Sequence, residues 1–387
     1  MSTNATHSSL IPRRAARALL LITTSLAAAC GGGVSPSPAP APSGTSTVPR
    51  TGSAAPMPLV QGAWAPRTRE HVDLWLHGYA LLTNDTTLVP YFRRGYRDRM
   101  IALRRQRGVT SQLDDSRAAL VARFSANPAL ATSGQFIPLY FESWDQLRQA
   151  IDLFLRAGGN PGATNDPALR GSIGLLAAAF PVNADREWLR QFAAALDDES
   201  RKFYHDYWTS ESRAHARVVS RVDSLWQLQW RPSLQRFLNN SQQQNGELYL
   251  SMPLGGEGRT IHASKQENAV AVAMPDNDDQ ADVALFVFVH EIAGAVSGTA
   301  IADNTTPAER RSGVTSRYEQ AAAVRAGAML LERTIPSVVP GYMRYYLQQA
   351  GRTAATDPRA GFTTAFAVPD AVRDAISRQL DVILGGI

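Results

Sequence analysis

The chain is poor in several features that would place a protein in a known class. It has one cysteine, Cys30, in 387 residues, so no disulfide bond can form within it. We find no internal repeat, and no second hydrophobic run long enough to span a membrane follows the N-terminal segment. No basic stretch is interleaved with aromatic residues. These absences exclude a disulfide-rich scaffold, and we expect no nucleic-acid partner.

The first thirty residues have the three parts of an export signal. Arg13, Arg14 and Arg17 are positive, and no Asp or Glu precedes Cys30. The apolar run ALLLITTSLAAA, residues 18–29, suits the hydrophobic part of a signal and is shorter than the ~20 residues of a spanning helix. It ends in LAAAC, which resembles the lipobox of bacterial lipoproteins, although the leucine stands four rather than three places before the cysteine.

This resemblance implies cleavage before Cys30 and acylation of its thiol. Lipid on Cys30 would hold the protein at the bilayer, since two or more acyl chains anchor stably. The expected location is the bacterial cell envelope, and Gly31, where an aspartate would retain the protein at the inner membrane, favours the outer membrane. Loss of residues 1–29 lowers the formal charge from +5 to +2, because three arginines leave with them. The alternative is an ordinary cleaved signal with an incidental cysteine.

Composition and periodicity divide the rest of the chain. Residues 30–65 are rich in glycine, proline and serine, so they predict a tether without a core. Residues 66–246 show helical spacing of apolar side chains, with a long helix near the end that bends or breaks at Pro232. Residues 247–387 add strands to helices. We therefore predict a mainly α protein with a small β-sheet (α+β).

Two strands and a buried helix are expected in the last region. The segments 247–254 and 267–275 alternate or are rich in valine and alanine, and the GGEG after the first predicts a tight turn. An acidic loop follows, and then an apolar helix from about Val283, with Asp279 or Asp282 as its N-cap.

The sharpest local feature is the sequence VFVHEIAGAV, which places His290 and Glu291 on that buried helix. A small sheet followed by a helix with an HE pair resembles the zincin metallopeptidases of the gluzincin type, whose helix carries HExxH and whose edge strand lines the substrate cleft. The resemblance covers residues 247–336. It implies a zinc ion held by His290 and by Glu319 on a downstream helix, with Glu291 as the general base, and a peptide or protein as partner.

The chain departs from this pattern at Gly294, which occupies the place of the second histidine. A site with one histidine and one or two carboxylates binds zinc less tightly than a complete one. His262, in the loop expected between the strands, or Asp303 after the helix would be the nearest replacements. Glycine inside a helix also suggests close packing or the approach of a ligand to the backbone.

Three interpretations stay open. The domain is a zincin-like fold that has lost metal and activity, a working metallopeptidase with unusual ligands, or an unrelated fold. In the last case, His290 and Glu291 would bond to an arginine such as Arg310, Arg311 or Arg317, and Gly294 would help to form a packing face of small residues. The protein would then be a non-enzymatic envelope lipoprotein whose helical body binds a partner protein or a cell-wall polymer.

Overall fold

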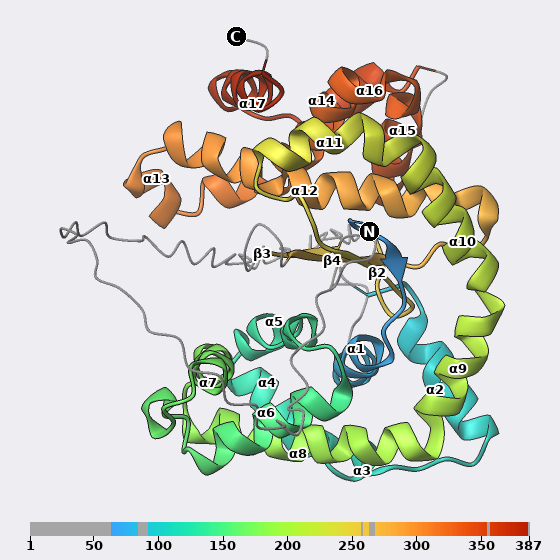
Figure 1. Cartoon of the computed structure of the whole chain (residues 1–387), viewed down its shortest axis with the longest axis vertical. Helices are drawn as coiled ribbons and strands as arrows, with labels where there is room; N and C mark the ends of the chain where they lie inside the picture. Colours follow the sequence, from blue (N-terminus) through green and yellow to red (C-terminus); the bar gives the residue numbers. More distant parts are fainter. Residues whose placement is uncertain (1–62, 84–91, 257, 263–267, 354–356, 386–387) are drawn as a thin grey trace, which may run out of the picture.

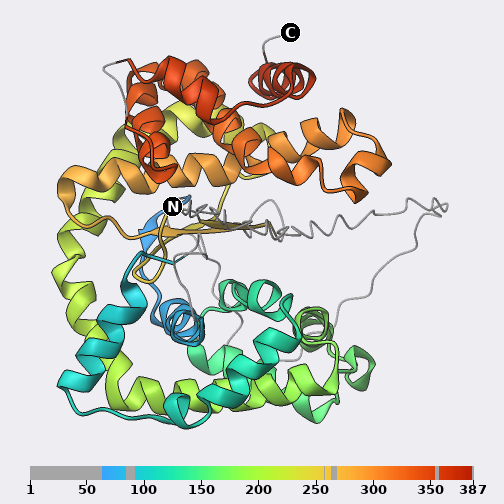
Figure 2. The ribbon, with the colours of Figure 1, turned by 180° about the vertical axis from the view of Figure 1, so that it is seen from behind.

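The computed structural model of the chain describes residues 63–83, 92–256, 258–262, 268–353 and 357–385. The predicted signal segment, Cys30 and the predicted tether up to residue 62 lie outside these residues. The described chain is mostly helical with one small sheet, which confirms the predicted fold class. Figures 1 and 2 show the sheet between two layers of helices.

The layer drawn below the sheet in Figure 1 comes from the first half of the described chain. Its helices are α1 (Glu70–Leu82), α2 (Tyr96–Gln106), α3 (Gln112–Asp115), α4 (Arg117–Ala126), α5 (Leu130–Ser133), α6 (Trp144–Arg156), α7 (Pro167–Ala179) and α8 (Asn183–Glu199), with short 3-10 turns at Ile137–Tyr140 and Pro161–Ala163. The amphipathic periodicity of this half predicted its helical character.

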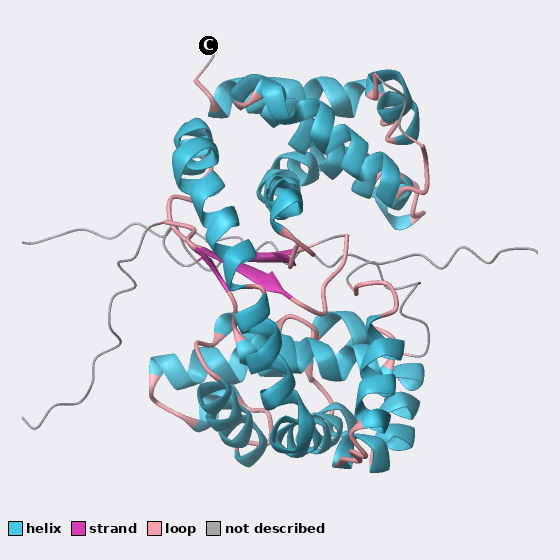
Figure 3. Cartoon of the chain, turned by 90° about the vertical axis from the view of Figure 1, so that its right-hand side faces the viewer, coloured by secondary structure: helices cyan, strands magenta, loops and turns pink. Residues whose placement is uncertain are grey.

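A helical arm then connects the lower layer to the upper one (Figures 1 and 3). It consists of a π-helical turn (Ser200–Tyr204), α9 (His205–Ala214), α10 (Ala216–Leu225), a second π-helical turn (Trp226–Trp230) and α11 (Arg231–Asn240). The expected irregularity at Pro232 is present. Pro232 lies in the first turn of α11, directly after the second π-helical turn. A proline is tolerated there because first-turn amides have no partner within the helix.

The sheet has four strands in the order β1-β2-β4-β3. They are β1 (Pro66–Arg67), β2 (Glu247–Ser251), β3 (Arg259–His262) and β4 (Asn268–Ala273). β1 and β4 run parallel to β2, whereas β3 is antiparallel to β4 and forms an edge. The predicted strands correspond to β2 and β4. β1 was not predicted, and β3 lies where we expected only a turn and a loop.

Both faces of the sheet are covered, so alternate residues of each strand enter different hydrophobic cores. Val270 and Val272 of β4 face the upper core, while Ala269, Ala271 and Ala273 face the lower one. β2 alternates in the same way. The sheet is therefore a wall shared by two cores rather than the cover of one.

The upper layer contains the helices of the last third of the chain. They are α12 (Ala281–Asp303), α13 (Pro307–Arg311), α14 (Glu319–Thr334), α15 (Val339–Gln349), α16 (Arg359–Ala365) and α17 (Asp370–Ile383). Neither predicted aspartate caps α12. Its N-cap residue is Gln280, which makes no side-chain cap, and Asp282 lies in the first turn.

α12 is the buried helix that the sequence predicted. The segment Asp278–Asp303 is long and apolar enough to cross a membrane by length and composition, so the expectation of no such second run was wrong. However, 72% of its most apolar window is buried among the surrounding elements. It packs most extensively against α14, as the central helix of a protein core does.

The first described residues are anchored in the upper core. Trp64 is 0% exposed, its indole N–H donates to the Gln243 carbonyl at 2.9 Å, and its ring meets Phe288 edge-on at 5.1 Å. A Cβ at Gly246 would lie 2.5 Å from the Trp64 ring, so only glycine fits there. Residues 63–65, which composition had assigned to the tether, thus belong to the fold.

A buried carboxylate joins the lower layer to the sheet. Asp73 of α1 is 1% exposed and accepts hydrogen bonds from the Ser251 hydroxyl of β2, the Trp208 indole at 3.0 Å and the Met252 amide. Burial raises the pKa of Asp73 to about 7, although these donors and Arg93 oppose the shift. The Asp73 carboxyl therefore changes its charge near neutral pH.

Candidate functional site

His290 and Glu291 lie halfway along α12, beside the sheet. The Nδ1–H of His290 donates to Glu291 Oε1 at 3.3 Å, and the two side chains are only 10% and 12% exposed. A buried apolar helix accommodates such a pair only where its polar atoms have partners. The structure therefore places together the two residues that the motif singled out.

Strand β3 supplies the other partner of the carboxylate. The Thr260 hydroxyl donates to Glu291 Oε2 at 2.9 Å. Thr260 lies opposite Val270 in the antiparallel pair, on the face of the sheet that α12 covers. Both oxygens of Glu291 are thus bonded, and the carboxylate is directed to the edge of the sheet. In this sheet β2 is internal, and the edge strand β3 flanks the site.

Gly258 makes this approach sterically feasible. A Cβ there would lie 2.4 Å from the Ala271 carbonyl oxygen and 3.0 Å from Glu291 Cγ. A side chain at this position would push β3 away from both β4 and α12. The GGEG segment was predicted to be a tight turn; one of its residues, 257, lies outside the described residues, and Gly258 allows a close approach of the backbone to β4 and α12.

Replacing Thr260 by valine should detach Glu291 from the strand without changing the volume of the side chain. A hydrogen bond to a charged acceptor contributes about 1.5–3 kcal/mol, so the free energy of unfolding should fall by roughly that amount in urea titrations. Thr299→Val, on the exposed face of the same helix, is the control and should change stability by less than ~0.5 kcal/mol. Equal effects of the two changes would show that the Thr260 contact has no special weight.

Aromatic side chains from α15 border the pair. The rings of His290 and Tyr346 have their centroids 5.5 Å apart, and the Tyr345 hydroxyl donates to the Gly256 carbonyl at 3.2 Å. Tyr342 lies deeper and donates to the Val324 carbonyl at 3.0 Å. Helix α15 therefore fastens the segment between β2 and β3 next to the pair. These tyrosines therefore pack at the site.

Gly294 is not closely packed, which corrects one expectation. An added Cβ would meet no atom within 4 Å outside the helix itself, and the same holds at Gly298. The proposed packing face of small residues is therefore not formed within the described part of the chain. The position four residues beyond His290 faces open space instead.

The further predicted ligands come from the start of α14, the end of α12 and the end of β3. Glu319 is the first residue of α14 and is partly buried. Asp303 ends α12, roughly 20 Å along the helix axis from His290. His262 ends β3, and its side chain lies outside the described residues. Over the residues that the structure describes, no three His, Cys, Asp or Glu side chains are grouped as a metal site requires.

One of the arginines that the non-zincin interpretation suggested, Arg310, donates to the carbonyls of Ala302 and Thr305. Glu291 accepts from Thr260 and from His290. The side chain of Arg317 lies outside the described residues. The pair thus joins strand β3 to helix α12.

A second polar cluster is buried in the lower layer. Glu199 accepts from His77 at 3.2 Å and pairs with Arg104 at 3.0 Å, and Ser111 also donates to it. Burial opposes the charge of Glu199, but the contacts with His77 and Arg104 outweigh it and keep the pKa of Glu199 below its ordinary value. These side chains lie in the interior, where they connect α1, α2 and α8.

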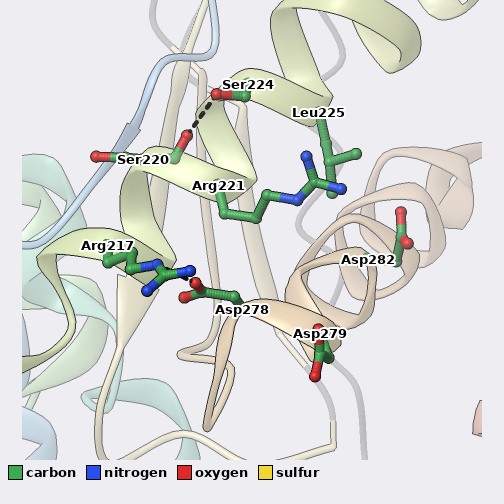
Figure 4. A pocket seen from close by; sticks show the side chains of 8 residues that line it. All are labelled: Arg217, Ser220, Arg221, Ser224, Leu225, Asp278, Asp279 and Asp282. Carbon is green, nitrogen blue, oxygen red and sulfur yellow. Dashed lines mark hydrogen bonds and ion pairs between the residues drawn. The ribbon is translucent and has the colours of Figure 1, made fainter.

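A polar pocket of about 600 Å³ lies between α10 and the start of α12 (Figure 4). Two arginines, two serines and a leucine of α10 line one side, and three aspartates around the beginning of α12 line the other. From the sequence, these aspartates were predicted only as part of an acidic loop and as possible N-caps of the helix. The partner arginines were not recognised, because they lie about sixty positions earlier.

The comparisons with known proteins give no relative. No family model, no curated protein and no solved structure matches the chain.

Proposed function

We propose that the protein is a membrane-anchored bacterial envelope lipoprotein whose β3–α12–α15 region is a zincin-like module that has lost its metal site. This module binds an extended peptide or protein segment. The acylated Cys30 holds it at the bilayer, in the outer membrane. The observation that carries the proposal is the contact of an antiparallel edge strand, β3, with the His-Glu pair of the helix that follows the sheet.

The residues present do not fit a resident zinc ion. Such a site needs three or four protein donors, and here one histidine is followed by Gly294 at the fourth position. Glu291 would be the general base if activity remained. Its two oxygens are instead held by Thr260 and His290, which supports a binding role over hydrolysis.

The same hydrogen bonds also favour the rival function, in which the helical body receives a partner protein or a cell-wall polymer and the pair is purely structural. The two proposals share the lipid anchor and differ in where the partner lies. A binding experiment that identifies the contacted residues separates them.

We expect a library of acetylated and amidated random heptapeptides with a central benzophenone to crosslink to residues 258–262 and to α15. The adducts would be located by mass spectrometry. Adducts confined to the lower helical layer would support the rival function, and their complete absence would overturn peptide binding. We expect no peptide cleavage beyond that of Glu291→Gln. A wild-type activity that this change abolishes would show a working peptidase.

Replacing Cys30 by alanine should move the protein from the membrane fraction to the soluble fraction and abolish incorporation of labelled palmitate in a bacterial host. The reason is that the thiol is the acyl acceptor and no other cysteine can substitute for it. A Cys30→Ala protein that stayed lipid-labelled and membrane-bound would refute the anchor, whatever the result of the peptide experiment.

Gly294→His should raise the affinity for zinc at least tenfold over the wild type, because imidazoles at i and i+4 on an open helix face converge on one ion. Equilibrium dialysis with a colorimetric zinc indicator measures this. Ala295→His is the matched control, since its side chain leaves the helix in another direction. Equal zinc affinities of Gly294→His and Ala295→His would show that position 294 is not the one placed to share an ion with His290.

A further inference from the structure

The pocket between α10 and the beginning of α12 is separate from the candidate site. Asp282 stands in the first turn of α12, eight residues and therefore about 12 Å along the axis before His290. The walls come from two elements that are distant in sequence and carry charges of both signs. Such a wall is suited to a small ligand that is itself charged at both ends.

The charges of the lining do not cancel. Arg217 forms an ion pair with Asp278. Arg221 has no ion pair with any residue that the structure describes, and it extends from α10 toward the start of α12, where Asp282 lies (Figure 4). Asp279 and Asp282 make no ion pair within the described chain either. One positive and two negative groups therefore remain, with a net charge of −1.

We propose that this pocket binds a basic α-amino acid, a ligand with one carboxylate and two ammonium groups. Arg221 receives the carboxylate, because a guanidinium offers two parallel N–H donors to its oxygens. Asp279 and Asp282 receive the ammonium groups, and Leu225 contacts the methylene chain between them. The ligand charge of +1 then neutralises the lining.

The surroundings of Asp282 support this assignment. Burial raises the pKa of this carboxyl, while the Trp230 indole and Arg221 act in the opposite direction. Burial takes water away from the Asp282 carboxylate. An ammonium group beside it would replace the favourable interaction that is lost with that water. An apolar ligand or an anion would add no favourable partner for this carboxylate.

Isothermal titration calorimetry with L-lysine tests the proposal on the full chain without its signal. We expect lysine to bind at least tenfold more tightly than cadaverine, which lacks the carboxylate, and than norleucine, which lacks the second ammonium. Arg221→Gln and Asp282→Asn should each weaken lysine binding at least tenfold. Arg105→Gln, an exposed arginine of α2, is the control and should leave it unchanged.

The outcome decides the proposal in each arm. No heat of binding at millimolar lysine, or equal affinity for lysine and cadaverine, overturns it. So does full lysine affinity in both pocket variants. If Asp282→Asn fails to fold, Arg221→Gln alone is sufficient, because it should abolish the preference for lysine over cadaverine.

Discussion

Replacing Asp73 by asparagine is expected to remove a pH-dependent loss of stability of roughly 4 kcal/mol. In the unfolded chain this carboxyl has its ordinary pKa of 3.8, whereas in the folded protein burial raises its pKa to about 7. As the pH rises through this window, the unfolded state releases a proton that the folded state retains. Asp73 therefore makes its full contribution to the stability of the wild type below about pH 4, and this contribution is lost as the pH rises to about 7.

Asparagine does not titrate and keeps the shape of the carboxyl, so Asp73→Asn should lack this loss. Urea unfolding at intervals from pH 4 to pH 8 measures it as the difference between variant and wild type. The two should be similar in stability at pH 4 and diverge toward pH 8, with the variant more stable. Asp145→Asn, on an exposed surface, should track the wild type. Parallel curves of unfolding free energy against pH for Asp73→Asn and the wild type would disprove the raised pKa of Asp73.

The second large effect is expected at Trp64. Removing a fully buried indole costs about 3–5 kcal/mol, and Trp64→Ala also leaves the Gln243 carbonyl without its donor. The free energy of unfolding in urea should fall by this amount. Trp64→Phe should lie between Trp64→Ala and the wild type in stability, because a phenyl ring keeps part of the indole's packing while the second ring and the N–H are lost.

Leu228→Ala is the control for this experiment, since Leu228 is 83% exposed. It should change stability by less than about 0.5 kcal/mol. Because Phe288 stands two residues before His290, amide hydrogen exchange around the candidate site should also rise in Trp64→Ala. A Trp64→Ala protein as stable as Leu228→Ala would show that the start of the fold lies after this residue.

The helices were predictable because their apolar side chains recur at helical spacing, as in α6 and α8. The strands β2 and β4 were predictable because valine, leucine and alanine dominate them. β1 and β3 were not, because segments of two and four residues are too short to carry a periodic signal. What makes β3 a strand is its pairing with β4, a tertiary effect that local sequence does not contain.

The candidate site was half predictable. Adjacent ionisable residues in an apolar helix mark His290 and Glu291, since burial requires partners for both. The sequence does not reveal that Thr260, thirty-one positions away, supplies one of them. The choice of Glu319 rested on the gluzincin resemblance and on its place in a helix downstream of Glu291, and it stays a prediction. The pocket was not predicted either, because its two walls, like Thr260 and Glu291, are distant in the sequence.

Trp64 also determines how the protein would respond to tension on its N-terminus. The chain enters the fold through this buried ring and continues at once into β1, which pairs parallel with β2. A pull on the segment before residue 63 would act along the strand and load the indole and the β1–β2 hydrogen bonds together. Under such shear the bonds would break in concert, so a force on the preceding segment would reach the sheet before any helix unravels.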